Sequence, residues 1–239
     1  MGAIALLGSG EFEPWARPVD RWCADQATAG SDKVLVVPTA SAPEGDETFQ
    51  RWGRMGVEHY RAIGLSPEIL DLRDRNDASK KEIVDAVHGA RHIFFSGGNP
   101  GYLSETLIGT PFWDAVVSAV ANGETALGGC SAGAAFLGAT APFVAGDSLD
   151  HWTDGTKLLP RAYVIVHFDM IDTYVPGLRQ MLLDMRPEGT VTVAIDENTA
   201  LYGDGEHWQV SGSGSVWISA DGKELTEHPD GATLDLRLL

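Results

Sequence analysis

Short apolar runs alternate with segments of helical periodicity over the first 130 residues, and this alternation limits the fold most strongly. The apolar runs predict strands at 3–8, 33–39, 68–72, 92–97 and 125–129. Between them, apolar residues recur at helical spacing in 46–63, 79–88 and 111–121. Strands joined by crossover helices pair in parallel, and runs such as VLVV and HIFF are typical of strands buried on both faces. The sequence therefore predicts an α/β fold with a mostly parallel sheet and helices on both faces.

The last fifty residues have a different character. Short apolar runs at 191–196, 199–203, 207–212 and 215–220 are separated by Gly and Asp turns, which is typical of strands. We interpret them as a β-rich C-terminal tail of the same domain. Because no linker, repeat or low-complexity tract interrupts the 239 residues, we expect one domain spanning 1–239.

Charge and composition exclude several classes of partner. The formal net charge of −17 leaves nothing to neutralise phosphates, so neither nucleic acid nor an anionic membrane is expected as a partner. The N-terminal apolar run is predicted to be a strand rather than a signal peptide, and no run approaches membrane-spanning length. Cys23 and Cys130 are too few for a disulfide framework or a cysteine zinc site. We expect a cytoplasmic protein without metal or organic cofactor, and leave a homodimer open.

The stretch GGCSAGAAFLG, residues 128–138, places two candidate nucleophiles side by side. Gly129 to Gly133 match G-x-S-x-G, the pattern of a nucleophile on a sharp turn between a strand and a helix. The competing pattern G-x-C-x-G would need glycine where Ala132 stands. The register therefore favours Ser131 as the nucleophile and Cys130 as a small buried packing residue. A tight turn that serves packing alone is the alternative.

A serine nucleophile needs a base, and the base needs a carboxylate. Of seven histidines, His167 is favoured because it ends the apolar run AYVIVHF, at the strand edge where Ser131 is also expected. His151 is the second choice, whereas His59 is expected on a helix surface and His92 in the core. The pattern leaves the acid open among these residues: Asp196, Glu197, Asp147, Asp150, Asp169 and Asp172.

An oxyanion intermediate needs preorganised N–H donors. One is the backbone N–H of Ala132, directly after the nucleophile. Another is expected from FFSGGNPG, residues 94–101, where glycines let the backbone approach a substrate. The stretch GSGEF, residues 8–12, follows the first strand and is expected to line the same cleft. Neither glycine-rich stretch completes a phosphate-binding motif.

Four blocks match a known family in order: GSGEF, IFFSGGN, GCSAGAAFLG, and VIVHF paired with VAIDENTAL. With these the chain resembles the cyanophycinase and dipeptidase E family of serine peptidases over most of its length. The resemblance implies a flavodoxin-like fold of the class I glutamine amidotransferase type. It also implies Ser131 as nucleophile, His167 as base, Glu197 as acid, and Gly98 and Ala132 as oxyanion donors. In the dipeptidase E branch the acid would instead come from the segment of Asp147 and Asp150.

The sequence departs from the family where substrate is recognised. After the HF pair, Met170, Ile171 and Thr173 replace the polar and basic residues typical of cyanophycinases, so a β-aspartyl-arginine polymer is not expected as substrate. Asn99, Phe168 and Asp169 are the expected substrate-binding residues, and the charge of Asp169 and Asp172 favours a substrate with an amino group or a basic side chain.

The predicted function is a serine hydrolase that cleaves an amide bond of a small peptide through an acyl-enzyme. An amidase or esterase acting on a small non-peptide substrate is one alternative. A non-catalytic binding protein on the same scaffold is the other, and it predicts that Ser131 and His167 do not reach hydrogen-bonding distance.

Overall fold

A computed structural model describes residues 1–145, 148–220, 222 and 224–239, with the side chains of 142–152 outside the description. The apolar runs of the first half form five parallel strands, in the spatial order β1 (Ile4–Leu7), β5 (Ala126–Cys130), β4 (His92–Phe95), β2 (Lys33–Val37) and β3 (Ser66–Ile69). Leu7 is in register with Cys130, and Phe95 with Gly129. The segments that follow β1, β5 and β4 therefore meet at one edge of the sheet.

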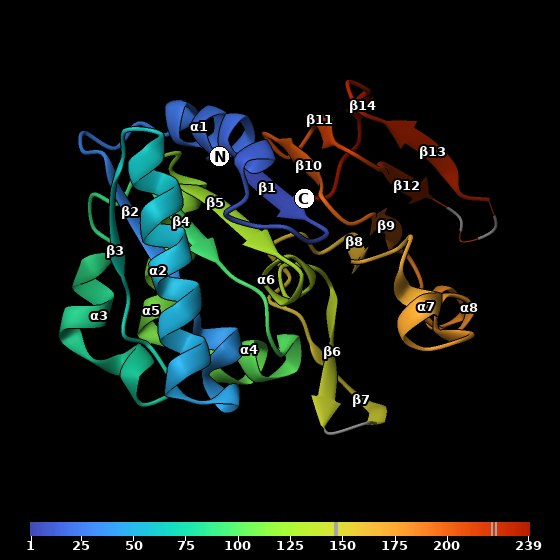
Figure 1. Cartoon of the computed structure of the whole chain (residues 1–239), viewed down its shortest axis with the longest axis horizontal. Coiled ribbons are helices and arrows are strands. Elements are labelled where there is room, and N and C mark those ends of the chain that lie inside the picture. Colours follow the sequence, from blue (N-terminus) through green and yellow to red (C-terminus); the bar gives the residue numbers. More distant parts are fainter. Residues whose placement is uncertain (146–147, 221, 223) are drawn as a thin grey trace.

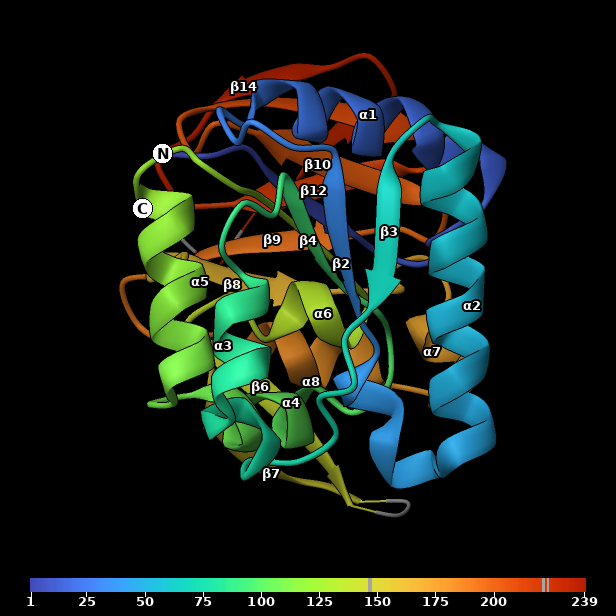
Figure 2. The same cartoon turned by 90° about the vertical axis from the view of Figure 1, so that its left-hand side faces the viewer.

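Helices cover both faces of this sheet, as the alternation predicts. One face is covered by α1 (Arg17–Gln26) and α2 (Asp46–Ala62). The other is covered by α3 (Lys81–Ala86), α4 (Pro100–Leu107), α5 (Pro111–Ala121) and α6 (Ala132–Ala135). Figure 2 shows α2 and α5 on opposite sides of the strands. The predicted α/β architecture is confirmed.

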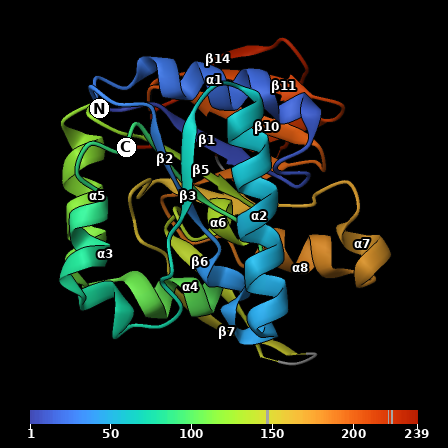
Figure 3. The same ribbon diagram turned by 60° about the vertical axis from the view of Figure 1, so that its left-hand side comes forward.

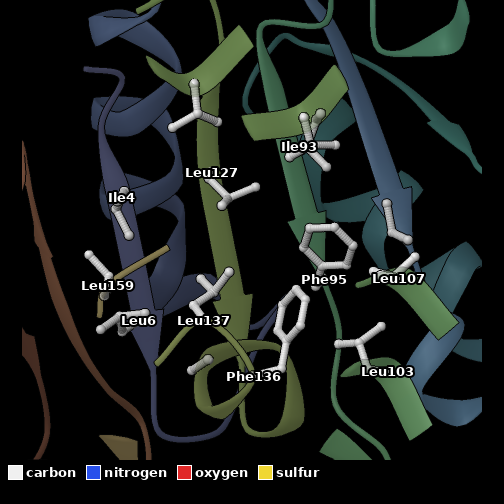
Figure 4. Packing of buried hydrophobic residues seen from close by; sticks show 14 of the residues in the cluster. Ile4, Leu6, Ile93, Phe95, Leu103, Leu107, Leu127, Phe136, Leu137 and Leu159 are labelled. Carbon is white, nitrogen blue, oxygen red and sulfur yellow. The ribbon is translucent and has the colours of Figure 1, made fainter. Parts of the chain in front are cut away.

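Two apolar cores result from the alternation of side chains along each strand. Ile4 and Leu6 of β1 join the larger core, where Phe95 and Phe136 pack with ring centroids 4.9 Å apart. Figure 4 shows this packing, in which Leu127 of β5 lies between Ile4 of β1 and Phe95 of β4. Ala5 and Leu7 point the other way, under α1 and α2.

The C-terminal tail divides between two sheets. Strands β10 (Thr199–Gly203), β11 (His207–Gly212) and β14 (Thr233–Asp235) extend the parallel sheet in antiparallel fashion beyond β1. Strands β8 (Ala162–Ile165), β9 (Val191–Ile195), β12 (Ser215–Ser219) and β13 (Thr226–Pro229) form a separate sheet in which only β8 and β9 are parallel. The sequence predicts a β-rich tail of the same domain, but it does not indicate that the strands of this tail divide between two sheets.

The sequence analysis did not predict three further features of the fold. A hairpin of β6 (Thr140–Ala145) and β7 (Ser148–Asp154) follows α6. The short helices α7 (Ile171–Tyr174) and α8 (Leu178–Asp184) follow β8 and project at the end of the molecule away from α3 and α5 (Figure 1 and Figure 3). Strand β3 also begins and ends earlier than the expected 68–72, because its pairing with β2 runs from Ser66 to Ile69.

One histidine expected at the surface is buried. His59 is only 2% exposed, and its Nε2 lies 2.7 Å from Oδ2 of Asp20 on α1. The hydroxyl of Tyr60 donates to the other oxygen of Asp20, at 3.1 Å. His92 also lies in this buried cluster, as expected, and burial, partly opposed by Asp20, lowers its pKa to about 4. Helical spacing places His59 on the inner face of α2. The hydrogen bond to Asp20 offsets the free-energy cost of burying the imidazole there.

The Asp20 cluster generates a stability prediction. We expect Asp20→Ala to lower the free energy of unfolding by about 3 kcal/mol, because the substitution leaves the buried polar groups of His59 and Tyr60 without their hydrogen-bond partner. The matched control is Asp25→Ala on the same helix, which removes only an exposed ion pair with Arg21 and is expected to cost under about 1 kcal/mol. Urea denaturation measures both. Equal losses would show that the buried cluster does not hold α1 and α2 together.

Candidate active site

Ser131 stands on a strained turn between β5 and α6. Its backbone has φ 51° and ψ −112°, a conformation that L residues rarely adopt. The hydrogen bond from Ser131 N to the carbonyl of Leu7, at 2.9 Å, holds the turn against β1. Backbone strain of this kind costs about 1–3 kcal/mol and is concentrated at functional sites.

The two glycines of the motif allow the strand and the helix to approach closely. A Cβ on Gly129 would lie 1.9 Å from the carbonyl oxygen of Gly133. A Cβ on Gly133 would lie 2.0 Å from the carbonyl oxygen of Phe95 in the neighbouring strand. Both contacts are with backbone, which cannot move aside. The spacing of the motif therefore follows from the crowding at this turn.

Cys130, the last residue of β5, is buried among the residues of the sheet face that α1 and α2 cover. It is fully inaccessible and packs among the residues beneath α1. Burial, together with the neighbouring Glu11 carboxylate, raises the pKa of the Cys130 thiol well above its usual range. A thiol without thiolate character is a poor nucleophile, so Cys130 is the packing residue that the register predicts.

His167 reaches Ser131 from the second sheet. It follows β8 with a positive φ of 54°, and its Nε2 lies 2.9 Å from Oγ of Ser131. We expected its strand to lie in the same parallel sheet as Ser131, and that expectation is wrong, because β8 pairs only with β9. The two residues meet because the carboxyl ends of β5 and β8 face each other across the two sheets. The distance does not fit the alternative of a non-catalytic protein with separated side chains.

Glu197, in the turn after β9, completes the row of hydrogen bonds. Its Oε1 lies 2.9 Å from Nδ1 of His167 and accepts a bond from the Tyr174 hydroxyl at 2.7 Å. Partial burial raises the pKa of Glu197, but the bonds from Tyr174 and His167 outweigh it, so this pKa is lower than usual. The same hydrogen bond raises the pKa of Tyr174. Glu197 is therefore a carboxylate at neutral pH.

The structure separates the other candidate acids from His167 or leaves them undescribed. Asp196 is buried on the far side of the turn, where it accepts bonds from Ser215 N at 2.9 Å and from the Trp217 indole. Asp147 lies outside the described residues. The side chains of Asp150 and of His151, the second choice for the base, lie there too.

Asp169 and Asp172 both have protein partners. Oδ1 of Asp169 accepts a hydrogen bond from the backbone N–H of Glu197 at 2.8 Å and so anchors the acid's turn. Oδ1 of Asp172 accepts from the Arg179 N–H at 2.9 Å, and its other oxygen lies 3.6 Å from the Arg179 guanidinium. Their charge is therefore partly engaged, which weakens the expectation that they attract a basic substrate.

The loop after β4 passes directly over Ser131. A Cβ on Gly97 would lie 3.5 Å from Cβ of Ser131, and Gly97 N donates to Oε1 of the buried Glu11 at 2.8 Å. Gly98 has φ 140°, and a Cβ there would lie 2.3 Å from the Ala40 carbonyl carbon. In the described part of the chain, neither Gly98 N nor Ala132 N donates to an acceptor. The N–H group next to Ser131 in the chain, and the one next to Gly97 in the loop near Ser131, therefore have no acceptor in the described part of the protein.

Two of the expected substrate-binding residues also contact the protein itself, and for Asn99 the expectation stays a prediction. Oδ1 of Asn99 caps α4 by accepting from Tyr102 N at 3.0 Å. Phe168 is only 3% exposed and lies beneath the Arg179 guanidinium, 4.7 Å from its ring centroid. Burial prevents direct contact of Phe168 with a substrate in this conformation, so its place in the HF pair serves packing behind His167.

Sequence reasoning missed the role of Tyr174 and named Glu11 only within a motif. Tyr174 follows His167 by seven residues, and no pattern places its hydroxyl on Glu197. The GSGEF stretch was expected to line the cleft, and two of its residues contact the loops of the site: Glu11 accepts from Gly97 N at 2.8 Å, and Ser9 Oγ accepts from Asn198 N at 3.1 Å. Across the described residues, no cluster of three or more His, Cys, Asp or Glu is placed to hold a metal. None of the described helices is long and apolar enough to cross a membrane.

Comparison with known proteins identifies the family of this chain. The model of peptidase family S51 matches residues 4–211. A cyanophycinase from Nostoc sp. is 28% identical over 236 residues, which cover 94% of this chain and 75% of the cyanophycinase.

Solved structures extend the likeness to the fold. The crystal structure of a peptidase from an acI-B1 Actinobacterium has a TM-score of 0.89 and 30% identity, covering 99% of this chain and 97% of that chain. A Listeria monocytogenes protein described as peptidase E shares the fold, with a TM-score of 0.59 at 18% identity over 96% of this chain and 98% of that chain. The chain therefore belongs to peptidase family S51 and is a serine-type peptidase.

Proposed function

We propose that this peptidase cleaves small peptides through a Ser131–His167–Glu197 triad and an acyl-enzyme. The observation that carries the proposal is the continuous row of hydrogen bonds from Ser131 Oγ through the imidazole to Glu197, each 2.9 Å long. A serine hydroxyl is a weak nucleophile unless a positioned base accepts its proton. A carboxylate at Nδ1 leaves Nε2 as the proton acceptor and stabilises the imidazolium that forms.

In the first half of the reaction, Ser131 Oγ attacks the carbonyl carbon of the scissile bond while its proton moves to Nε2 of His167. The negative charge that develops on the carbonyl oxygen is held by the N–H groups of Gly98 and Ala132. Collapse of the tetrahedral intermediate breaks the C–N bond, and His167 returns the proton to the leaving amine. Water, deprotonated by His167, then hydrolyses the ester and restores Ser131.

Glu11 supports the oxyanion donors without touching the substrate. Its buried carboxylate binds the N–H of Gly97 and so fixes the loop that presents Gly98. Because Gly97 N is engaged there, Gly98 is the donor from this loop. Cyanophycinase and peptidase names among the similar proteins support peptide hydrolysis as the reaction.

The first test is labelling with a small fluorophosphonate that reacts with activated serines. We expect wild-type protein to gain one adduct by intact mass, and Ser131→Ala to lose it along with peptidase activity, which should fall by at least about a thousandfold. Cys130→Ala is the matched control from the adjacent position and is expected to keep the adduct. If Ser131→Ala is still labelled, or wild-type protein is not, the assignment of Ser131 is wrong.

A second prediction concerns Tyr174, whose hydroxyl helps keep Glu197 ionised. A hydrogen bond to a charged group contributes about 1.5 kcal/mol, so we expect Tyr174→Phe to lower kcat/KM about tenfold at pH 7. Losing the bond raises the pKa of Glu197 toward its usual value. The ratio of wild-type to variant activity should therefore grow as pH falls from 7 to 5.

Tyr202→Phe is the control, since it removes a hydroxyl bonded to Gln209 and away from the triad. Rates measured across this pH range for all three proteins check the prediction. A ratio for Tyr174→Phe that does not change with pH would mean that the hydroxyl contributes only to packing.

A further inference from the structure

An apolar cavity of about 210 Å³ lies beside His167. It is enclosed by α6, β8, and the α7–α8 segment that projects at this end of the molecule (Figure 1). Its apolar walls are formed by Ala135, Val164, Ile165, Val166, Ile171, Leu178 and Leu182. Ala135 lies one helical turn beyond Ser131, and His167 contacts Ser131 directly, so the cavity is adjacent to the candidate active site.

The polar side chains in the wall already use their hydrogen-bond donors within the protein. The Tyr163 hydroxyl donates to the carbonyl of Leu182 at 3.0 Å. The Tyr174 hydroxyl donates to Glu197, and both ring nitrogens of His167 are engaged in the triad. Among the described residues that line the cavity there is no Asp, Glu, Lys or Arg. A charged side chain placed there would lose its hydration without gaining an oppositely charged partner from this lining, which is strongly unfavourable.

The volume of the cavity suits one side chain. An apolar cavity of about 150 Å³ accommodates a benzene molecule. The space beside His167 is somewhat larger, so it can hold an aromatic or branched aliphatic side chain but not a longer piece of peptide.

The position of the cavity identifies which substrate residue would occupy it. His167 forms part of its wall, and His167 Nε2 must reach the amine that leaves when the peptide bond breaks. The residue that carries this amine therefore lies against His167, and its side chain can enter the cavity. We propose that the cavity is a subsite for a large apolar side chain on the leaving-group side of the scissile bond. This inference rests on the proposed triad.

The test measures protection of Ser131 from the fluorophosphonate by amino acid amides, which mimic the leaving group. We expect leucinamide and phenylalaninamide to halve the labelling rate at concentrations at least about tenfold lower than those that glycinamide needs, because burying a larger apolar side chain favours binding. Argininamide, which has a side chain of similar reach but carries a charge, is expected to protect no better than glycinamide.

A pair of variants on one helix links the effect to the cavity. Leu178 and Leu183 are both half-buried on α8 and pack against the same apolar cluster, but only Leu178 lines the cavity. We expect Leu178→Trp to fill the space and abolish the advantage of phenylalaninamide over glycinamide. Leu183→Trp should preserve it, and thermal unfolding verifies that both variants fold.

The outcomes separate this inference from the proposed function. Labelling of Ser131 with equal protection by all four amides would overturn the subsite and leave the triad intact, whereas no labelling of wild-type protein would overturn both. Tyr174, Val175, Met181 and Met185 expose apolar surface on the same segment. If the amides do not protect and Leu178→Trp alone converts a dimer to a monomer in sedimentation velocity, the cavity belongs to an interface between copies, and the inference is wrong.

Discussion

The hydrogen bond between Ser131 Oγ and His167 Nε2 joins two halves of the molecule that are held by different sheets. Ser131 depends on the parallel sheet, whose strands β1, β5 and β4 end together and leave room only for glycine around the turn. His167 and Glu197 depend on the parallel pair β8 and β9 of the smaller sheet. The relative placement of the two sheets therefore sets the geometry on which the proposed chemistry depends, and the apolar core shared by Leu6, Val164 and Val193 fixes that placement.

Several backbone contacts reinforce this junction. The Glu197 N–H is held by Asp169, and the Asn198 N–H by Ser9 in the loop after β1. Glu11 in that same loop binds Gly97. The short segment 8–12 thus contacts the turn of Glu197 and Asn198 and also the loop of Gly97, which gives a physical reason for a polar, glycine-rich stretch after the first strand.

The sequence predicts the parallel sheet and its helices well, because strands buried on both faces are continuously apolar and helices such as 111–121 carry their own start signals. It also predicts that Ser131, His167 and Glu197 belong together, through motif and resemblance. It does not predict that β8 and β9 leave the main sheet, because strand pairing is decided by contacts between distant segments rather than by local pattern. For the same reason the burial of His59 against Asp20, and the hydroxyl of Tyr174 on Glu197, could not be anticipated from either residue's neighbours.

The α7–α8 segment, a stretch of about fifteen residues, contributes side chains to two parts of the site. It supplies the Tyr174 hydroxyl to the acid, and it supplies Ile171, Leu178 and Leu182 to the cavity wall. Because it is anchored mainly to the smaller sheet and projects from the body of the molecule, its sequence can vary without disturbing the turn that carries Ser131. The proposed selectivity and the ionisation of Glu197 are thus coupled through one short exposed element: an exchange of this segment that keeps Tyr174 would alter the cavity alone, whereas one that replaces Tyr174 would also change the surroundings of Glu197.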